Sequence, residues 1–155
     1  MKIYVASSWR NEFQHHVVEA LRKDGHEVYD FKGTGDGWGK NNQGPGGFAW
    51  SEVAQPGKDW KQWTVAEFIE ALDHPRAEQG FRRDMDALEQ SSACVMVMPC
   101  GPSASMEMGY ACGAGKKVYV YIPAMREPDL MVKMASLVTD DLDLIQSLLY
   151  ASDNP

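Results

Sequence analysis

Hydrophobic positions along this chain occur as short apolar runs that alternate with amphipathic stretches. Four runs are rich in strand-forming residues and too short for typical helices: 3–6, 26–31, 95–98 and 118–122. Apolar residues recur at helical spacing over five longer stretches: 12–23, 64–72, 75–90, 103–113 and 140–150. This alternation predicts an α/β fold, a flavodoxin-like doubly wound parallel sheet of about five strands flanked by helices, with a last short strand at 137–138.

The stretch 93–122 has the size of a βαβ unit and organises the rest of the chain. Its first strand is broken by the proline- and glycine-containing segment 99–102. Its helix is expected to stop at 113–115, where glycine adopts positive φ at low cost. We therefore expect a ligand-binding edge after the first strand of this unit, because ligands bind at the carboxyl ends of strands in open α/β sheets.

One charged residue stands out in the helix of this unit. Glu107 lies close to the carboxyl end of the preceding strand. Met106, Gly109, Tyr110 and Gly113 share one side of the helix at helical spacing, and Glu107 borders that side. From spacing alone, Glu107 is equally well explained as a solvated carboxylate in the first turns of a helix, where the macrodipole favours negative charge.

Composition sets outer limits on the function. At 155 residues with 44% apolar residues, the chain suits one globular domain, 1–155, with a real core. The net charge of −7 argues against a nucleic-acid surface. No apolar run approaches the roughly 18 residues of a membrane helix. No signal peptide is apparent and the cysteines suit reduced thiols, so a cytoplasmic location is expected. Scattered histidines and cysteines predict no metal site and no cofactor.

The loop 7–11 follows the first strand and precedes a helix. Ser8 and Arg10 offer a hydroxyl and a guanidinium group there, next to the free N–H groups of a helix N-terminus, and this combination suits an anion. The alternative is simple helix capping by Ser8 or Asn11.

Residues 32–61 form a long glycine- and tryptophan-rich segment. Loops of this length in compact domains are usually functional or disordered, and disordered segments carry few large aromatic residues. We interpret the segment as a mobile flap whose tryptophans, among them Trp38, Trp50 and Trp60, pack partly on the core and partly over a ligand. The alternative is a surface loop that uses its tryptophans only as anchors.

Two local motifs carry a resemblance to a known enzyme family. The first is the opening strand and loop, Ile3-Tyr4-x-Ala6-x-Ser8-Trp9. The second is the pattern Gly101-x-Ser103-x-x-x-Glu107-x-Gly109-x-Ala111-x-Gly113-x-Gly115-Lys116-x-Val118. Together they resemble the nucleoside 2-deoxyribosyltransferase family, including the related deoxynucleoside 5'-monophosphate N-glycosidases.

The resemblance implies roles for individual residues. Glu107 matches the nucleophile that attacks the anomeric carbon, and Tyr4 matches a tyrosine beside it. Asp84, with Asp86 as the fallback, matches an aspartate that contacts the sugar; the residues alone allow both to be exposed helix charges. The remaining candidates would bind substrate: Ser8, Trp9, Arg10, Gly101, Ser103, Ser105 and Trp50. Of these, Ser8 and Arg10 match the residues that hold the 5'-phosphate in the monophosphate hydrolases.

The sequence departs from the transferases in two respects. Gly101 stands six residues before Glu107, where the transferases have an acidic residue that assists the base, and the C-terminal tail is not Asn-rich. These departures argue against base exchange, and Arg10, Ser103 and Ser105 favour a 5'-phosphate on the substrate.

The expected function is cleavage of the N-glycosidic bond of a nucleoside or nucleoside 5'-monophosphate, by hydrolysis or deoxyribosyl transfer. A homo-oligomer is expected by analogy with the family. The alternatives are a non-catalytic nucleotide-binding or sensing module on the same scaffold, and an NAD hydrolase resembling the TIR type.

Overall fold

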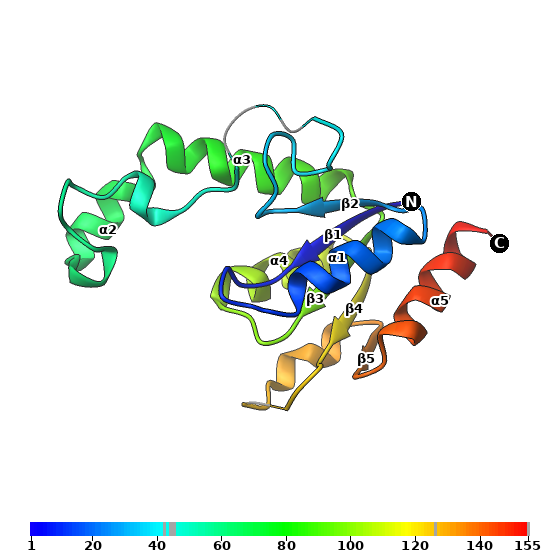
Figure 1. Ribbon diagram of the computed structural model, residues 1–155. Coiled ribbons are helices and arrows are strands. Elements are labelled where there is room, and N and C mark those ends of the chain that lie inside the picture. The colour runs from blue at the N-terminus through cyan, green and yellow to red at the C-terminus, as the bar shows by residue number, and fades with distance from the viewer. Residues whose placement is uncertain (42, 44–45, 126, 155) are drawn as a thin grey trace.

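Five parallel strands form one sheet in the computed structural model, which describes residues 1–41, 43, 46–125 and 127–154 (Figure 1). The strands are β1 (Lys2–Ala6), β2 (Glu27–Asp30), β3 (Ala93–Val97), β4 (Lys117–Tyr121) and β5 (Leu137–Thr139). Their order in the sheet is β2-β1-β3-β4-β5, and every neighbouring pair is parallel. The predicted flavodoxin-like fold class is confirmed.

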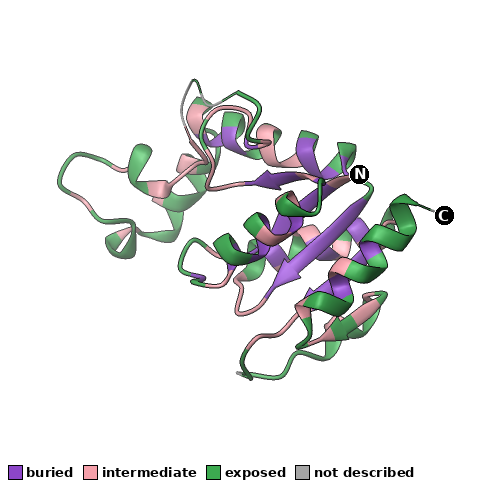
Figure 2. Ribbon diagram, turned by 45° about the vertical axis from the view of Figure 1, so that its right-hand side comes forward, coloured by how far each residue is buried: buried purple, intermediate pink, exposed green. Residues whose placement is uncertain are grey.

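Helices cover both faces of the sheet. The α-helices are α1 (Gln14–Lys23), α2 (Val65–Leu72), α3 (Pro75–Gln90), α4 (Pro102–Gly113) and α5 (Leu142–Asp153). Short 3-10 turns are η1 (Trp50–Glu52), η2 (Trp60–Gln62) and η3 (Leu130–Met134). Side chains of α1 and α5 join the hydrophobic cluster on one face, and those of α3, α4 and η3 join the cluster on the other. Figure 2 shows the buried strands between these two layers.

The bounds of the predicted helices and strands agree with the structure to within three residues. The helix expected from residue 12 begins at Gln14 instead, because Asn11 caps it: the Asn11 Oδ1 atom accepts hydrogen bonds from the backbone N–H groups of Phe13, at 2.7 Å, and Gln14, at 3.0 Å. Of the two capping candidates in the loop, Asn11 performs this role.

The packed side of α4 differs from the side on which the sequence places its larger apolar residues. Ala104, Met108 and Ala111 are buried against the sheet, whereas Met106 is 69% exposed and Tyr110 is 42% exposed. Two of the three packed residues are alanines, which allow the helix to approach the strands closely. Glu107 therefore lies next to the buried face of α4, as expected, although the residues that define that face are different.

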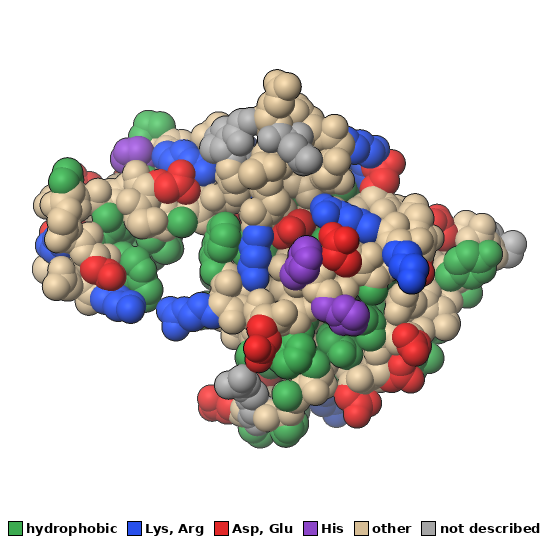
Figure 3. All heavy atoms as spheres, viewed as in Figure 1, with side chains coloured by type: hydrophobic (Ala, Val, Ile, Leu, Met, Phe, Trp, Pro, Cys, Tyr) green, Lys and Arg blue, Asp and Glu red, His purple; other side chains and the backbone are tan. Residues whose placement is uncertain are grey.

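A projecting arm extends from the sheet and consists of η1, η2, α2 and the beginning of α3 (Figure 1). Figure 3 shows that the arm stands apart from the body of the molecule, with an opening between them. Its inner contacts are aromatic: Trp50 lies edge-to-face with Phe48, Trp63 and Phe68, with ring centroids 4.9, 5.9 and 5.4 Å away. The arm therefore has a small hydrophobic centre of its own.

The connection between arm and body depends on two glycines. A Cβ atom on Gly80 of α3 would lie 2.4 Å from the Phe48 Cβ atom, and a Cβ atom on Gly47 would lie 1.8 Å from the Phe31 carbonyl oxygen. Neither distance is possible for a real side chain. Glycine at these two positions thus lets the chain pass closely over α3 and over the end of β2.

Candidate active site

The site predicted from the sequence lies at the carboxyl ends of β1 and β3. The chain leaves β1 towards α1 on one face of the sheet and leaves β3 towards α4 on the other. Ligands bind at such a switch point in open α/β sheets. Asn11 joins the loops after the two strands, since its Nδ2 atom donates to the carbonyl oxygens of Val97, at 3.0 Å, and Pro99, at 2.8 Å. Ser7 Oγ also donates to the Val97 oxygen, at 2.9 Å. The two loops are thereby held in one fixed arrangement.

Glu107 projects from α4 into a partly desolvated environment. Burial is the main cause that raises the pKa of Glu107 to about 8, and the negative charge of Asp84 raises it further. The nearby hydroxyl of Tyr4 lowers this pKa, to a smaller extent. Burial and the charge of Asp84 therefore favour the protonated form of Glu107 near neutral pH.

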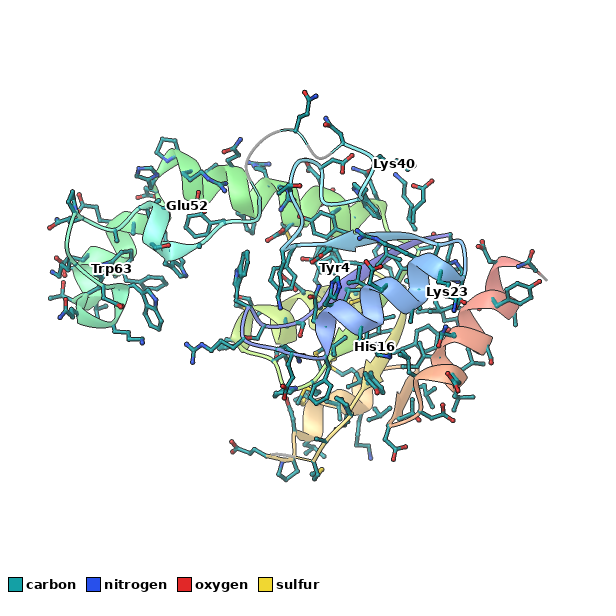
Figure 4. The ribbon with its side chains drawn as sticks, viewed as in Figure 1. Tyr4, His16, Lys23, Lys40, Glu52 and Trp63 are labelled. Atoms are coloured by element: carbon teal, nitrogen blue, oxygen red, sulfur yellow. The ribbon has the colours of Figure 1, made fainter. Side chains whose placement is uncertain are left out.

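Tyr4 lies in the middle of β1 and is fully buried (Figure 4). Within the described part of the chain, its hydroxyl has no hydrogen-bond partner. Burial, followed by the charges of Glu107 and Asp84, raises the pKa of Tyr4 well above its usual value. The phenol is therefore a neutral donor that is available to the Glu107 carboxylate.

Asp84 is held by a second tyrosine. Tyr29 of β2 donates from its hydroxyl to the Asp84 Oδ1 atom at 2.6 Å. Its ring stacks on that of Tyr4, with centroids 5.1 Å apart and planes inclined by 20°. Burial raises the pKa of Asp84, while the Tyr29 hydrogen bond and the charge of Arg83 oppose this rise. Of the two stacked phenols, Tyr29 thus donates to Asp84, whereas the Tyr4 hydroxyl lies near Glu107.

Arg83 contacts the Tyr29 ring and is itself held by backbone carbonyl oxygens. Its guanidinium group lies 5.4 Å from the Tyr29 ring centroid and donates to the carbonyl oxygens of Phe31, Gly33 and Gly35, at 3.2, 2.6 and 3.1 Å. Asp86, two residues beyond Asp84, is exposed. Of the two aspartates proposed from the sequence, the structure brings Asp84 to Glu107.

The loop after β1 presents the candidate phosphate ligands at the surface. Arg10 is exposed, and its side chain takes part in no ion pair among the described residues. Ser8 Oγ accepts a hydrogen bond from the Arg10 backbone N–H at 3.3 Å. Trp9 is 50% exposed and lies edge-to-face with Phe31, with centroids 5.4 Å apart.

The second set of substrate candidates lies at the N-terminus of α4. Gly101 is the N-terminal cap residue of α4, and its carbonyl oxygen accepts from the Ser105 N–H at 3.3 Å. A Cβ atom on Gly101 would meet no atom within 4 Å, so the space beside it is open. Ser103 is exposed in the first turn, where helix N–H groups favour an anion.

Trp50 does not lie with the other candidates. It belongs to the aromatic centre of the arm, whereas Trp38, from the same predicted flap, packs on Tyr29 with ring centroids 5.4 Å apart. The anchoring role that the sequence allowed is thus observed for Trp38. A role for Trp50 at a ligand, and closure of 32–61 over it, remain predictions; residues 42, 44 and 45 of this segment lie outside the described residues.

A cavity of about 210 Å³ lies beside η3, and its lining includes Met98, Ile122, Asp129 and Val132. None of the candidate residues lines it, so the cavity and the Glu107 cluster are separate features. Across 1–41, 43, 46–125 and 127–154, no group of three or more His, Cys, Asp or Glu side chains could hold a metal ion. Within the same ranges, no helix is long and apolar enough to cross a membrane.

Comparison with solved structures finds the same fold in two enzymes. A 2-deoxyribosyltransferase from the psychrotolerant bacterium Bacillus psychrosaccharolyticus aligns over 94% of this chain and 90% of its own, with a TM-score of 0.55 and 19% identity. A CMP N-glycosidase, BcmB, from Clostridium botulinum aligns over 96% of this chain and 98% of its own, with a TM-score of 0.52 and 12% identity. No family model matches the sequence, and the search of curated proteins gives no significant match.

The first of these structures is a 2-deoxyribosyltransferase, as in the motif resemblance, and the second is an N-glycosidase named for CMP, a ribonucleoside 5'-monophosphate. At such low identity, the likeness shows the fold. The roles of single residues in this chain therefore rest on its own geometry and on the motif resemblance.

Sequence reasoning missed two residues of the carboxyl cluster. Tyr29 occupies an inward position of an alternating strand, and this pattern predicts burial without indicating where the hydroxyl points. Arg83 lies among carboxylates on its own helix, and this pattern indicates only solvated ion pairs. The missing information was the strand order, because only the pairing of β1 with β2 places Tyr29 opposite Tyr4.

Proposed function

We propose that this protein cleaves the N-glycosidic bond of a nucleoside or nucleoside 5'-monophosphate, with Glu107 as the nucleophile. The observation that carries the proposal is a pair of partly desolvated carboxyl groups, Glu107 near Tyr4 and Asp84 bonded to Tyr29, with the two tyrosines stacked on neighbouring strands. Buried carboxyl groups with raised pKa values in such a place are typical of catalytic sites. The activities of the two solved enzymes with this fold agree with the reaction class.

In the proposed first step, a carboxylate oxygen of Glu107 forms a bond to the anomeric carbon. The bond from that carbon to the base nitrogen breaks, and the nitrogen keeps the electron pair and takes up a proton from solvent water. Asp84, fixed by Tyr29, positions the sugar hydroxyls. Tyr4 orients the Glu107 carboxylate and stabilises its charge by hydrogen bonding.

In the second step, water attacks the anomeric carbon, the ester bond to Glu107 breaks, and the carboxylate is regenerated as the water loses a proton. If a second base attacks instead of water, the same intermediate leads to base exchange. Gly101 stands where the transferases have an acidic residue that assists the base, so we propose hydrolysis as the main outcome.

The proposal is tested by incubating the protein with nucleosides, nucleoside 5'-monophosphates and NAD and measuring the released base by chromatography. We expect base release from monophosphates in preference to nucleosides. Release of nicotinamide from NAD alone would support the NAD hydrolase instead. Tight nucleotide binding without release of any base would support a sensing module.

Glu107→Gln is the decisive variant, because it keeps the side-chain volume and removes the nucleophilic charge. We expect substrate binding to persist and base release to stop. Glu70→Gln on the exposed surface of α2 is the matched control and should retain full activity. A 2-fluoro-sugar analogue is expected to trap a covalent adduct on Glu107 in the unmodified protein. Substantial turnover by Glu107→Gln would remove Glu107 from the mechanism.

A further inference from the structure

Lys32 is a half-buried cation to which neither the motifs nor the proposed mechanism assigns a role. It follows β2 directly, and its Nζ atom donates to the Asn11 carbonyl oxygen at 3.1 Å. The same nitrogen lies 5.7 Å from the centroid of the Phe31 ring. Burial lowers the pKa of Lys32, which shows that its ammonium group has lost part of its hydration.

No acidic side chain compensates this charge by direct contact. Within the described ranges, Lys32 takes part in no ion pair. Asp30 is close enough to raise the pKa of Lys32, but this effect is smaller than that of burial. The Asp30 Oδ1 atom is already hydrogen bonded to two neutral donors, Gln14 Nε2 at 2.8 Å and the backbone N–H of Lys32 at 2.9 Å.

Lys32 contacts the loop after β1, which carries the candidate phosphate ligands. Asn11, whose carbonyl oxygen holds the ammonium group, directly follows Arg10 in the chain. The loops after β1 and β2 therefore bring a lysine and an exposed arginine to the same edge of the sheet. An ammonium group has three donors, and the Asn11 oxygen is the acceptor that the structure provides for one of them.

We propose that Lys32 is a specificity-determining residue that binds the 5'-phosphate of the substrate together with Arg10. This inference rests on the proposed function and deepens it, because a second cation selects a phosphate dianion over an uncharged nucleoside. Arg10 supplies the planar, bidentate contact, and Lys32 supplies a compact charge that is already partly desolvated. A phosphate oxygen takes one of the remaining ammonium donors.

The experiment compares Lys32→Gln, Lys32→Arg and Lys32→Met with the unmodified protein. For each, KM and kcat are measured on a nucleoside monophosphate and on the matching nucleoside. Inorganic phosphate is used as a competing ligand, and its binding is also measured directly by calorimetry. Lys23→Gln is the matched control, because Lys23 ends α1 at the opposite end from Asn11 (Figure 4).

We expect Lys32→Gln and Lys32→Met to raise KM for the monophosphate roughly 10- to 100-fold and to weaken the binding of inorganic phosphate by a similar factor. The nucleoside should be affected much less, Lys32→Arg should recover part of the phosphate binding, and Lys23→Gln should change neither constant. If Lys32 only linked the two loops, its replacement would lower the activity on both substrates equally and leave the phosphate affinity unchanged. This result would overturn the inference.

The phosphate measurement also separates this inference from the proposed function. If the unmodified protein releases no base but binds inorganic phosphate in a Lys32-dependent way, the proposed reaction fails and the assignment of Lys32 stands. If base is released from monophosphates and Lys32→Gln leaves KM unchanged, the reaction stands and Lys32 is not a ligand.

Discussion

Glu107 must be ionised to act as a nucleophile, and its pKa is raised to about 8, chiefly by burial. We therefore expect kcat/KM to rise with pH through the range around pH 8, because kcat/KM reports the ionisation of the free protein. A pH–rate profile with a nucleoside lacking the phosphate avoids the titration of the substrate. A profile that is flat from pH 5 to 9 would contradict the assignment of the raised pKa to the nucleophile.

The same raised pKa makes a prediction about stability. A carboxyl group whose pKa is higher in the folded state stabilises the fold in acid, and this contribution is lost as the pH rises through the folded pKa. At high pH the folded protein holds a charged Glu107 carboxylate in a desolvated position, and Glu107→Gln removes this unfavourable contribution. The variant should therefore be more stable than the unmodified protein at pH 9 and differ little from it at pH 5. After allowance for partial solvent exposure, we expect a difference on the order of 1 kcal/mol, measured by thermal unfolding at both pH values.

Tyr29 acts on the site through Asp84. Its hydrogen bond lowers the pKa of Asp84, so Tyr29→Phe should raise that pKa and favour the neutral form of Asp84. The charge that Asp84 exerts on Glu107 is then smaller, and the pKa of Glu107 should fall. We expect the pH–rate midpoint to shift to lower pH and kcat to fall roughly tenfold. Tyr150→Phe, at an exposed position of α5, is the control.

At the level of elements, the loops after β1 and β3 act as one unit because of Asn11. Asn11→Ala removes the cap of α1 and both bonds to the β3 loop, and it should destabilise the fold by about 2–4 kcal/mol and strongly reduce activity. Asn11→Asp keeps an acceptor for the cap but cannot donate to Val97 and Pro99. If Asn11→Asp retained full activity, capping alone would explain the role of Asn11.

Most elements were predictable from the sequence because their patterns are local. Thr64-x-x-Glu67 has the pattern of a capping box, and both of its hydrogen bonds are present, at 3.2 and 2.7 Å; Pro75 starts α3, as the predicted range 75–90 requires. The position of Phe81 shows the limit of such patterns. Its spacing on α3 suggests the same side as Leu88, yet Phe81 is 58% exposed and Leu88 is buried.

For the candidate site, the sequence indicated Tyr4, Asp84 and Glu107 through a motif resemblance, and the structure brings these three together. Tyr29 and Lys32 could not be found in this way. Their functions depend on which strand lies beside β1 and on how the loop after β2 meets Asn11, and both are properties of the tertiary structure.

At the scale of the whole molecule, helix α2 of the arm exposes several apolar side chains. Val65 is 75% exposed, Ile69 is 59% exposed and Leu72 is 48% exposed. Contiguous exposed apolar groups of this kind are typical of protein interfaces. This agrees with the homo-oligomer that we expect from the family resemblance.

The oligomer prediction is tested by Ile69→Lys, which places a charge in the centre of this apolar surface. We expect the unmodified protein to be larger than a monomer in light scattering after size-exclusion chromatography, and Ile69→Lys to lower the mass of the particle. Lys61→Gln, at an exposed position of η2, is the control. An unmodified protein that remains monomeric at high micromolar concentration would refute the expectation.

The stacked pair of Tyr4 and Tyr29 also gives the protein a built-in optical signal. Burial raises the pKa values of both phenols, so neither ionises in the folded protein at the pH where a solvated tyrosine does. Conversion of phenol to phenolate changes the near-ultraviolet absorbance. In an alkaline titration, the part of that change contributed by these two rings should therefore appear only when β1 and β2 separate, and its time course would report the opening of the sheet at the site itself.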